Sequence, residues 1–226
     1  METLSVIIPV FNEKKTVEQL LKAVSAVKLP DYRKEIIVVD DGSTDGTREI
    51  LKKWETKYRV IYHPKNSGKG AAVTEGFRHA TGSILLIQDA DLEYSPDDYH
   101  ILLEPFNNPQ VNVVYGSRFL GPHLSTMFVY AMGNHFVTTM TDILYNTNIT
   151  DMETGFKVFR KRVIEGMTIT AKRFDFEPEF TAKVLKAGYQ IYEVPISYFG
   201  RKFSEGKKLT WRDGVIAFWT LIKYRF

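Results

Sequence analysis

Short apolar runs alternate with segments of helical periodicity over the first hundred residues of the chain. The runs are rich in β-branched and aliphatic residues and end in polar or turn-forming groups, which predicts strands at residues 4–10, 36–39, 60–62 and 84–88. Apolar residues recur at three- and four-residue spacing between them, which predicts helices at residues 17–27, 47–54 and 71–80. This order predicts an α/β fold with a largely parallel sheet covered by helices on both faces.

The second half of the chain is less regular. Further strands are predicted at residues 111–115, 156–159 and 191–194, and a further helix at residues 178–187. A weakly charged stretch at residues 126–147 is long enough for a membrane span, but Asn134, His135 and Asp142 interrupt it and are costly in hydrocarbon. We therefore expect a helix with one polar side. No repeat or linker is visible, so residues 1–226 are predicted to form a single domain.

Composition narrows the class of protein. With 226 residues, 44% of them hydrophobic, the chain can bury one sizeable core. A net charge of only +3 argues against a long electrostatic grip on nucleic acid. The absence of Cys excludes disulfides, thiolate catalysis and Cys-based metal sites, and it fits a reducing compartment. The first residues lack a basic segment and a cleavage site, so we expect no signal peptide.

Polar groups follow the predicted strands of the first half. In an open parallel sheet, ligands bind beyond the carboxyl ends of the strands. We therefore expect one site formed by Asn12 and Glu13, Asp40 and Asp41, the loop at residues 66–70, and Asp89 with Asp91.

The sequence ILLIQDADLEY ends an apolar run in two aspartates, Asp89 and Asp91. Residues two apart in an extended strand point to the same face, so both carboxylates can approach one object. Like charges held together favour a cation, and oxygen ligands suit Mg²⁺ or Mn²⁺ beside a phosphorylated substrate. Glu93 continues the alternation and is a candidate third ligand. The alternative is that the two aspartates only cap a turn.

Other strand ends suggest a nucleotide. Asp40 and Asp41 can accept hydrogen bonds from a ribose or a base, although DGSTDGT is also an ordinary turn followed by a helix cap. NSGKG offers glycines for close approach and Lys69 for a phosphate, but it is not a Walker A loop. No G-x-G-x-x-G follows the first strand. A nicotinamide enzyme and a P-loop NTPase are therefore both disfavoured.

Several segments, in a fixed order, carry a resemblance to a known family. They are IIPVFNE, VVDDGSTDGT, NSGKGAAVTEGF, QDADLEY, YGSRF, ITDMETGFKVF, FDFEPEFTAKVLKAGYQIYEVPISY and GRKFSEGKKLTWRDG. Along its whole length the chain resembles inverting family-2 glycosyltransferases of the GT-A fold, in particular the dolichyl-phosphate or polyprenyl-phosphate glycosyltransferase group. The resemblance implies a Rossmann-like sheet, a nucleoside-diphosphate-sugar donor, Mg²⁺ or Mn²⁺ at the D-x-D, and inversion at the anomeric carbon.

The resemblance also implies roles for individual residues. The residues expected against the donor's nucleoside are Pro9, Val10, Phe11, Glu13, Asp40 and Asp41, with Lys69 nearby. At the D-x-D, the metal ligands would be Asp89, Asp91 and Glu93, with Ala90 between the aspartates. Arg118 would meet the acceptor phosphate. Some relatives carry another Arg in the following helix, where this chain reads YAMGN.

Candidate catalytic groups lie in the last third of the chain. Arg201 and Lys207 belong to GRKFSEGKKLTW, which is either a solvated loop or, as the family motif favours, a segment that closes over the diphosphate. Glu177 lies where hydroxyl-glycosylating relatives carry a general base, and its alternative role is helix capping. Asp151 is the other candidate base, with a turn role as the alternative.

An aromatic segment ends the chain. Val215, Phe218, Trp219 and Ile222 recur at helical spacing between basic residues, which suits either a bilayer interface or a core-packed helix.

We therefore predict an inverting, metal-dependent hexosyltransferase. Residues 1–115 would bind a nucleoside-diphosphate sugar of the GDP-mannose or UDP-glucose type, and residues 116–226 a polyprenyl or dolichyl phosphate. The protein would be peripheral on the cytoplasmic face of the membrane, without a nucleic-acid partner, and its oligomeric state is not predicted. The alternatives are transfer to a sugar or small-molecule hydroxyl with Glu177 as base, a nucleotide-sugar-binding module without turnover, and, more weakly, a nucleotidyltransferase.

Overall fold

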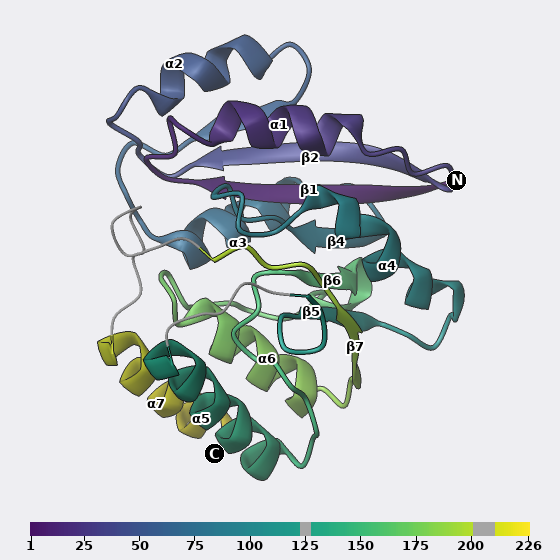
Figure 1. The fold of residues 1–226 in the computed structure, drawn as a ribbon, viewed down its shortest axis with the longest axis vertical. Coiled ribbons are helices and arrows are strands. Elements are labelled where there is room, and N and C mark those ends of the chain that lie inside the picture. Colours follow the sequence, from purple (N-terminus) through teal and green to yellow (C-terminus); the bar gives the residue numbers. More distant parts are fainter. Residues whose placement is uncertain (123–127, 201–210) are drawn as a thin grey trace.

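A computed structural model describes residues 1–122, 128–200 and 211–226. Within these residues the chain forms a seven-stranded sheet in the order β3-β2-β1-β4-β6-β5-β7 (Figure 1). The strands are β1 Glu2–Val10, β2 Tyr32–Asp40, β3 Arg59–Tyr62, β4 Ile84–Ile87, β5 Val113–Ser117, β6 Lys157–Arg160 and β7 Ile191–Pro195. The α/β class predicted from the alternation of strands and helices is confirmed.

The sheet is parallel except at one strand. β1 pairs in parallel with β2 and β4, β2 with β3, and β5 with β7. β6 runs antiparallel to both of its neighbours, β4 and β5. The chain builds β2 and β3 on one side of β1 and then crosses to β4 on the other side. This reversal lies between β1 and β4, where open α/β sheets bind ligands beyond the carboxyl ends of their strands.

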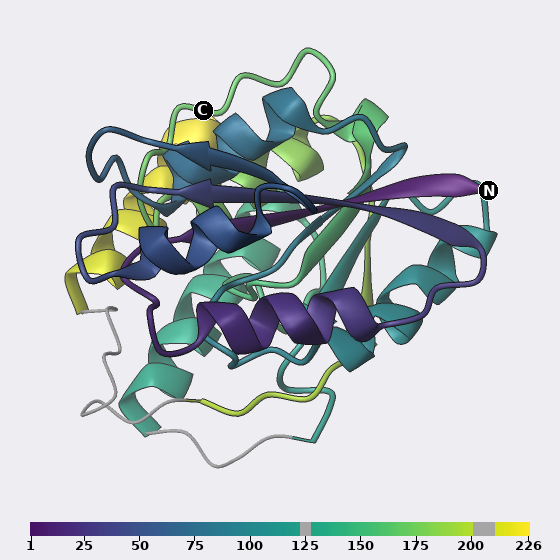
Figure 2. The same cartoon turned by 90° about the horizontal axis from the view of Figure 1, so that it is seen from above.

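Helices cover both faces of the sheet. They are α1 Val17–Ala26, α2 Thr47–Leu51, α3 Lys69–His79, α4 Tyr99–Leu103, α5 Phe128–Tyr145, α6 Phe176–Lys186 and α7 Trp211–Arg225. Val6 and Ile8 of β1 belong to the core beneath α1 and α4, whereas Ile7 belongs to the core beneath α3 and α6, as the two-residue period of a strand requires. Figure 2 shows α1 running along one face of the sheet.

α5 and α7 form an outer layer that packs on α6 at the side of the molecule where the chain ends (Figure 1). Val137, Met152, Ala182 and Leu221 fill the core between these helices. The predicted helix at residues 126–147 is α5, and its polar side is real but faces inward, because Thr138 and Thr141 are buried while Met132 and Phe136 are exposed. In the described part of the chain no helix has the length and apolar character needed to cross a bilayer.

The boundaries of the predicted elements shift by a few residues. β2 begins four residues earlier than predicted because its polar first half still pairs with β1. α2 ends early and continues as a 3-10 turn over Lys52–Trp54. The short helix α4 was not predicted, since five residues are too few for a helical period to be recognised.

Candidate active site

The polar groups that follow β1, β2, β4 and the loop before α3 converge at the carboxyl edge of the sheet. The main-chain nitrogen of Asn12 donates to Ser43 Oγ at 2.9 Å, and the main-chain nitrogen of Thr44 donates to Asn12 Oδ1 at 2.8 Å. Asp41 accepts hydrogen bonds from the loop before α3, and Lys69 at the start of that helix reaches Asp89. Each of these tips is thus linked to its neighbour by a hydrogen bond or an ion pair, and their use as one binding site stays a prediction.

Asp40 and Asp41 are both buried, and most of their oxygens bind protein groups. Asp41 Oδ1 accepts from the Ser67 amide at 2.9 Å and lies 2.8 Å from His63 Nδ1, and Oδ2 accepts from the Gly68 amide at 2.6 Å. Asp40 Oδ2 accepts from Arg48 Nε at 2.7 Å. Asp40 Oδ1 is buried with no hydrogen-bond partner among the described residues. Asp41 thus organises the loop, whereas Asp40 keeps one buried oxygen without a partner among the described residues.

Lys69 lies between two carboxylates from distant parts of the chain. Its Nζ is 2.8 Å from Asp89 Oδ1 and 2.8 Å from Glu177 Oε1. Burial alone would lower the pKa of Lys69, but the carboxylates of Asp89 and Glu177 outweigh it and hold that pKa well above its ordinary value. The ammonium group therefore stays charged and joins β4, α3 and α6 at one point.

Asp89 and Asp91 lie at the carboxyl end of β4 and are partly exposed. Gly155, in the loop that enters β6, comes so close that a Cβ there would lie 2.3 Å from Asp89 Oδ2, so a larger residue would displace the Asp89 carboxylate. Asp91 Oδ1 accepts from the Glu93 amide at 3.2 Å across a turn in which Leu92 has a φ of 64°. Asp91 thus stabilises a turn through Oδ1, as predicted, while its side chain stays partly exposed.

The carboxylates at the end of β4 fit a hard divalent cation whose remaining coordination positions are filled by a substrate and water. No three His, Asp or Glu side chains converge as a metal site anywhere in the described ranges. Mg²⁺, however, is commonly held by one or two carboxylates together with substrate phosphates and waters. Asp89 and Asp91 supply two such carboxylates. The Glu93 carboxylate accepts from Tyr198 Oη at 2.8 Å, and its role as a third ligand stays a prediction.

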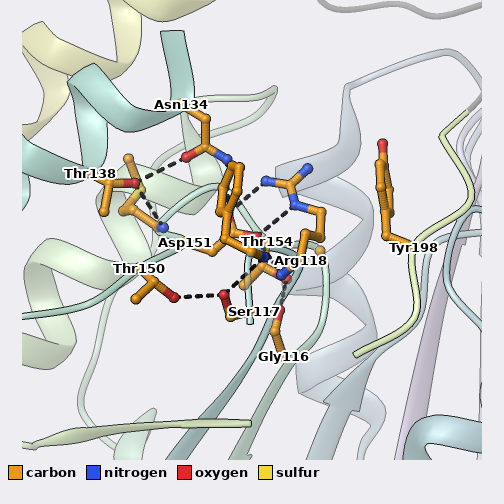
Figure 3. A network of polar contacts seen from close by, with 12 residues as sticks. Gly116, Ser117, Arg118, Asn134, Thr138, Thr150, Asp151, Thr154 and Tyr198 are labelled. Atoms are coloured by element: carbon orange, nitrogen blue, oxygen red, sulfur yellow. Dashed lines mark hydrogen bonds and ion pairs between the residues drawn. The ribbon is translucent and has the colours of Figure 1, made fainter. Parts of the chain in front are cut away.

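Arg118 and Asp151 form a buried pair on the other side of β4 (Figure 3). Arg118 Nε donates to Asp151 Oδ2 and Nη2 donates to Oδ1, each at 2.7 Å. Asn134 Nδ2 of α5 also donates to Asp151 Oδ1, at 2.8 Å. Burial alone would raise the pKa of Asp151, but Arg118 and these hydrogen bonds hold it below its ordinary value. Asp151 is therefore committed to Arg118, which does not favour its predicted alternative role as a general base.

Glu177 and Glu153 each carry a buried oxygen, Oε2 and Oε1 respectively, with no partner among the described residues. Glu177 is 4% exposed and begins α6, where a carboxylate also complements the helix dipole. Burial, and next the Glu177 carboxylate, raise the pKa of Glu153. Burial lowers the pKa of the neighbouring Lys157, whose Nζ donates to the carbonyls of Met152 and Thr154. The site thus has acceptors buried without partners.

The remaining predicted site residues divide into two groups. Val10 and Ala90 are buried in the core beneath α1, so any ligand contact there must use the backbone or a neighbouring side chain. Pro9 and Phe11 are half-buried beside them, and Glu13 is 8% exposed with Thr16 Oγ1 donating to it at 2.9 Å. Arg201 and Lys207 lie outside the described residues.

Sequence reasoning missed Asn134, Glu153 and Tyr198 as members of this site. Asn134 was noted only as a polar interruption of an apolar helix, yet a polar residue in such a helix is the signal that could have identified it. Glu153 and Tyr198 occur inside segments that were quoted for the family resemblance, and the segments alone do not say which side chains meet.

Comparison with known proteins agrees with this geometry. The sequence profile described as Glycosyl transferase family 2 matches residues 5–167. The dolichol-phosphate mannosyltransferase of Pyrococcus furiosus is 31% identical over 90% of this chain and 58% of its own length. The dolichyl-phosphate beta-glucosyltransferase ALG5C of Trichomonas vaginalis is 29% identical over 85% of this chain and 62% of its own. The chain thus spans about three fifths of these two relatives.

The fold has a counterpart among solved structures. Glucosyl-3-phosphoglycerate synthase from Mycobacterium tuberculosis, crystallised with Mg²⁺ and uridine diphosphate, superposes with a TM-score of 0.76 over 99% of this chain and 79% of that chain, at 18% identity. At that identity the likeness establishes the GT-A fold. The family profile covers most of the chain, so this chain belongs to glycosyl transferase family 2.

Proposed function

We propose that this chain transfers a hexose, with inversion at the anomeric carbon, from a nucleoside-diphosphate sugar to a polyprenyl or dolichyl phosphate. Family membership supports glycosyl transfer. The names of two relatives, a dolichol-phosphate mannosyltransferase and a dolichyl-phosphate beta-glucosyltransferase, support the lipid phosphate as acceptor. Both GDP-mannose and UDP-glucose types remain candidate donors.

The observation that carries the proposal is the geometry of Arg118. Asp151 accepts from Nε and Nη2, so within the described ranges the Nη1 group of Arg118 has no hydrogen-bond partner. A guanidinium fixed along one edge and open at the other is suited to a phosphate oxygen. The acceptor half, residues 116–226, would contribute this cation, and residues 1–115 would bind the donor.

The donor would lie along the carboxyl ends of β1, β2 and β4. Asp40 Oδ1 offers an acceptor to the nucleoside, and Lys69 keeps Asp89 and Glu177 in place. A divalent metal held by Asp89 and Asp91 would supply positive charge to the diphosphate as it leaves. Arg201 and Lys207 are proposed to add cationic charge to the same group.

The reaction would be a single displacement. An oxygen of the acceptor phosphate attacks the anomeric carbon from the face opposite the diphosphate, a new carbon–oxygen bond forms, and the bond to the diphosphate oxygen breaks. Phosphate is already anionic at neutral pH, so no side chain has to remove a proton. Arg118 would orient the attacking phosphate, a positioning role for which its fixed place beside Asp151 prepares it.

A lipid acceptor requires contact with a membrane, and α5 and α7 present an apolar face suited to it. Met132 and Phe136 on α5 are each 53% exposed, and Val215 and Trp219 on α7 are 58% and 65% exposed. The rings of Phe136 and Phe218 are 5.7 Å apart, so the two helices contribute to one surface. Because α5 also supplies Asn134 to Asp151, a membrane at this face would lie beside Arg118. We propose peripheral attachment at the cytoplasmic face.

The membrane face can be tested by co-sedimentation with anionic liposomes. Trp219→Ser and Phe136→Ser should each reduce the bound fraction, whereas Tyr192→Ser on β7 should not, although Tyr192 is 52% exposed. Equal binding by all three variants would reject α5 and α7 as the contact surface.

The proposed reaction can be tested by incubating the protein with UDP- and GDP-hexoses and short polyprenyl phosphates in the presence of Mg²⁺ or Mn²⁺, followed by mass spectrometry. A hexosyl polyprenyl phosphate with inverted configuration is expected. Donor binding by calorimetry without any product would instead identify a binding module without turnover.

A second candidate function is transfer to a hydroxyl with Glu177 as the base. The observation in its favour is Glu177 Oε2, a buried carboxylate oxygen that lacks a partner among the described residues. A hydroxyl acceptor placed there could give up its proton to that oxygen. Product formation with sugars but not with polyprenyl phosphates would favour this alternative.

A further inference from the structure

Tyr198 joins the D-x-D side of the site to the Arg118 side. Its hydroxyl donates to Glu93 Oε2 at 2.8 Å, and the guanidinium carbon of Arg118 lies over its ring, 5.3 Å from the centroid. The Tyr94 ring packs against the same ring, with the centroids also 5.3 Å apart. Tyr198 is 4% exposed, so these contacts leave its side chain little freedom.

The backbone fixes Tyr198 to the same segment. Tyr94 and Tyr198 form an isolated antiparallel β-bridge, and the Phe199 amide donates to the Glu93 carbonyl at 3.0 Å. The Tyr198 amide donates to the Pro122 carbonyl at 3.2 Å, which ties it to the chain that follows Arg118. A displacement of the segment at Tyr94 or of the segment after Arg118 would therefore move Tyr198 and be passed on to the other segment.

Arg118 is thus held by two partners of different kinds. Asp151 accepts two charge-assisted hydrogen bonds from Nε and Nη2. The Tyr198 ring lies beside the guanidinium group and makes a cation–π interaction with it (Figure 3). The Glu93 carboxylate accepts from the hydroxyl at the far end of the same tyrosine. A chain of contacts therefore runs from Glu93 through Tyr198 to Arg118.

We propose that Glu93 is a positioning residue that acts through Tyr198 on Arg118, and that it is not a ligand of the metal. The inference rests on the proposed function, since it takes Arg118 as the group that meets the acceptor phosphate. Asp89 and Asp91 then form the protein part of the metal site. In DADLE, Asp89 and Asp91 would thus serve the donor, and Glu93 would serve the acceptor.

The test compares Glu93→Ala, Tyr198→Phe and the double variant with wild type and with Tyr192→Phe, a control at an exposed tyrosine. The KM for a short polyprenyl phosphate should rise about tenfold in each single variant, the size expected for one hydrogen bond to a charged group, and no further in the double variant. kcat should change less, and Tyr192→Phe should match wild type.

A second measurement uses no acceptor. Mn²⁺ is titrated into each variant with UDP or GDP present, and free Mn²⁺ is followed by electron paramagnetic resonance. Both single variants should bind Mn²⁺ within about twofold of wild type, because neither removes a ligand. The proposal is overturned if Glu93→Ala weakens Mn²⁺ binding tenfold or more while Tyr198→Phe does not, or if the two effects on KM multiply.

The outcome can be separated from failure of the proposed function. If polyprenyl phosphate is not the acceptor, wild type forms no product with it. The Mn²⁺ titration and thermal unfolding then decide whether Glu93 acts together with Tyr198, because neither measurement needs an acceptor. Coupled residues should give a double variant whose Tm is no lower than that of the less stable single variant. Additive shifts in Tm would contradict the link between Glu93 and Tyr198.

Discussion

Two strand ends on the same edge carry paired aspartates, and their surroundings differ. After β2, Asp41 is buried and accepts from the amides of Ser67 and Gly68, so its charge is used to shape a loop. After β4, Asp89 and Asp91 are partly exposed, and Asp89 is balanced by the ammonium group of Lys69. The same residue type at comparable positions thus stabilises a loop in one place and remains partly exposed in the other.

The contrast teaches that charge balance, more than position, separates a structural carboxylate from a functional one. A buried carboxylate whose lone pairs all meet amide donors has little left for a ligand. A partly exposed carboxylate that is paired with one ammonium group keeps oxygen lone pairs that a metal or a hydroxyl can use when the substrate arrives. Variants at the two tips should therefore separate loss of stability from loss of activity.

The largest effect is expected at Asp91. Asp91→Ala should lower transfer by about 10³-fold, because Asp91 would hold the divalent cation that stabilises the negative charge of the departing diphosphate. Its Tm should stay within about 2 °C of wild type, since partly exposed turn residues contribute little to stability. Steady-state rates and a thermal melt of the same sample provide the check, and excess chelator should reproduce the loss in wild type.

The opposite behaviour is expected at Asp41. Asp41→Ala should cost about 3 kcal/mol of unfolding free energy, because the buried amides of Ser67 and Gly68 lose a charged acceptor. Urea unfolding at 25 °C measures it. If Asp41→Ala proved as stable as Asp91→Ala, the distinction between the two tips would be wrong.

Lys69 offers a smaller effect with a defined dependence on pH. Lys69→Gln should cost about 2 kcal/mol at pH 7, because Asp89 and Glu177 lose their shared cation. The folded state raises the pKa of Lys69, so its contribution is present in full below the ordinary lysine pKa of about 10.4 and is lost only as the pH rises through the raised value.

Urea unfolding of wild type and Lys69→Gln at pH 7 and pH 9 checks this expectation. The advantage of wild type should be at least as large at pH 9 as at pH 7. An advantage that shrank towards pH 9 would mean that Lys69 loses its proton in that range, and the ion pairs would not have the strength described above.

The smallest effect is expected at Glu177. If the nucleophile is a phosphate, Glu177→Gln should reduce the transfer rate by about fivefold or less, because no proton has to be removed and only the contact with Lys69 weakens. A loss of 10²-fold or more would favour the hydroxyl acceptor. Tm should be measured in parallel, so that a change in folding is not mistaken for a change in chemistry.

Much of the first half of the chain could be predicted from sequence. The apolar runs of β1, β2 and β4 are buried on both faces, and each is followed by polar residues, so local pattern and tertiary position agree. The convergence of Asp40, Asp41, Lys69 and Asp89 follows from the parallel pairing of those strands.

The second half of the chain could be predicted only in part. The strand at residues 156–159 was expected, but its antiparallel direction depends on which neighbours it joins, and a run of four residues does not encode that. The pairing of Arg118 with Asp151 joins residues 33 positions apart, and that of Glu93 with Tyr198 joins residues 105 apart. Composition and spacing carry no information on such partners.

The direction of β6 has a consequence for assembly. Because this strand runs against its neighbours, it is the segment entering it, with Asp151 and Gly155, that reaches the carboxyl edge. Val158 and Phe159 anchor opposite cores, so a slip of one residue would exchange them and withdraw Asp151 from Arg118 in the same movement. A molecule with that register would therefore lose its core packing and the Arg118–Asp151 pair together.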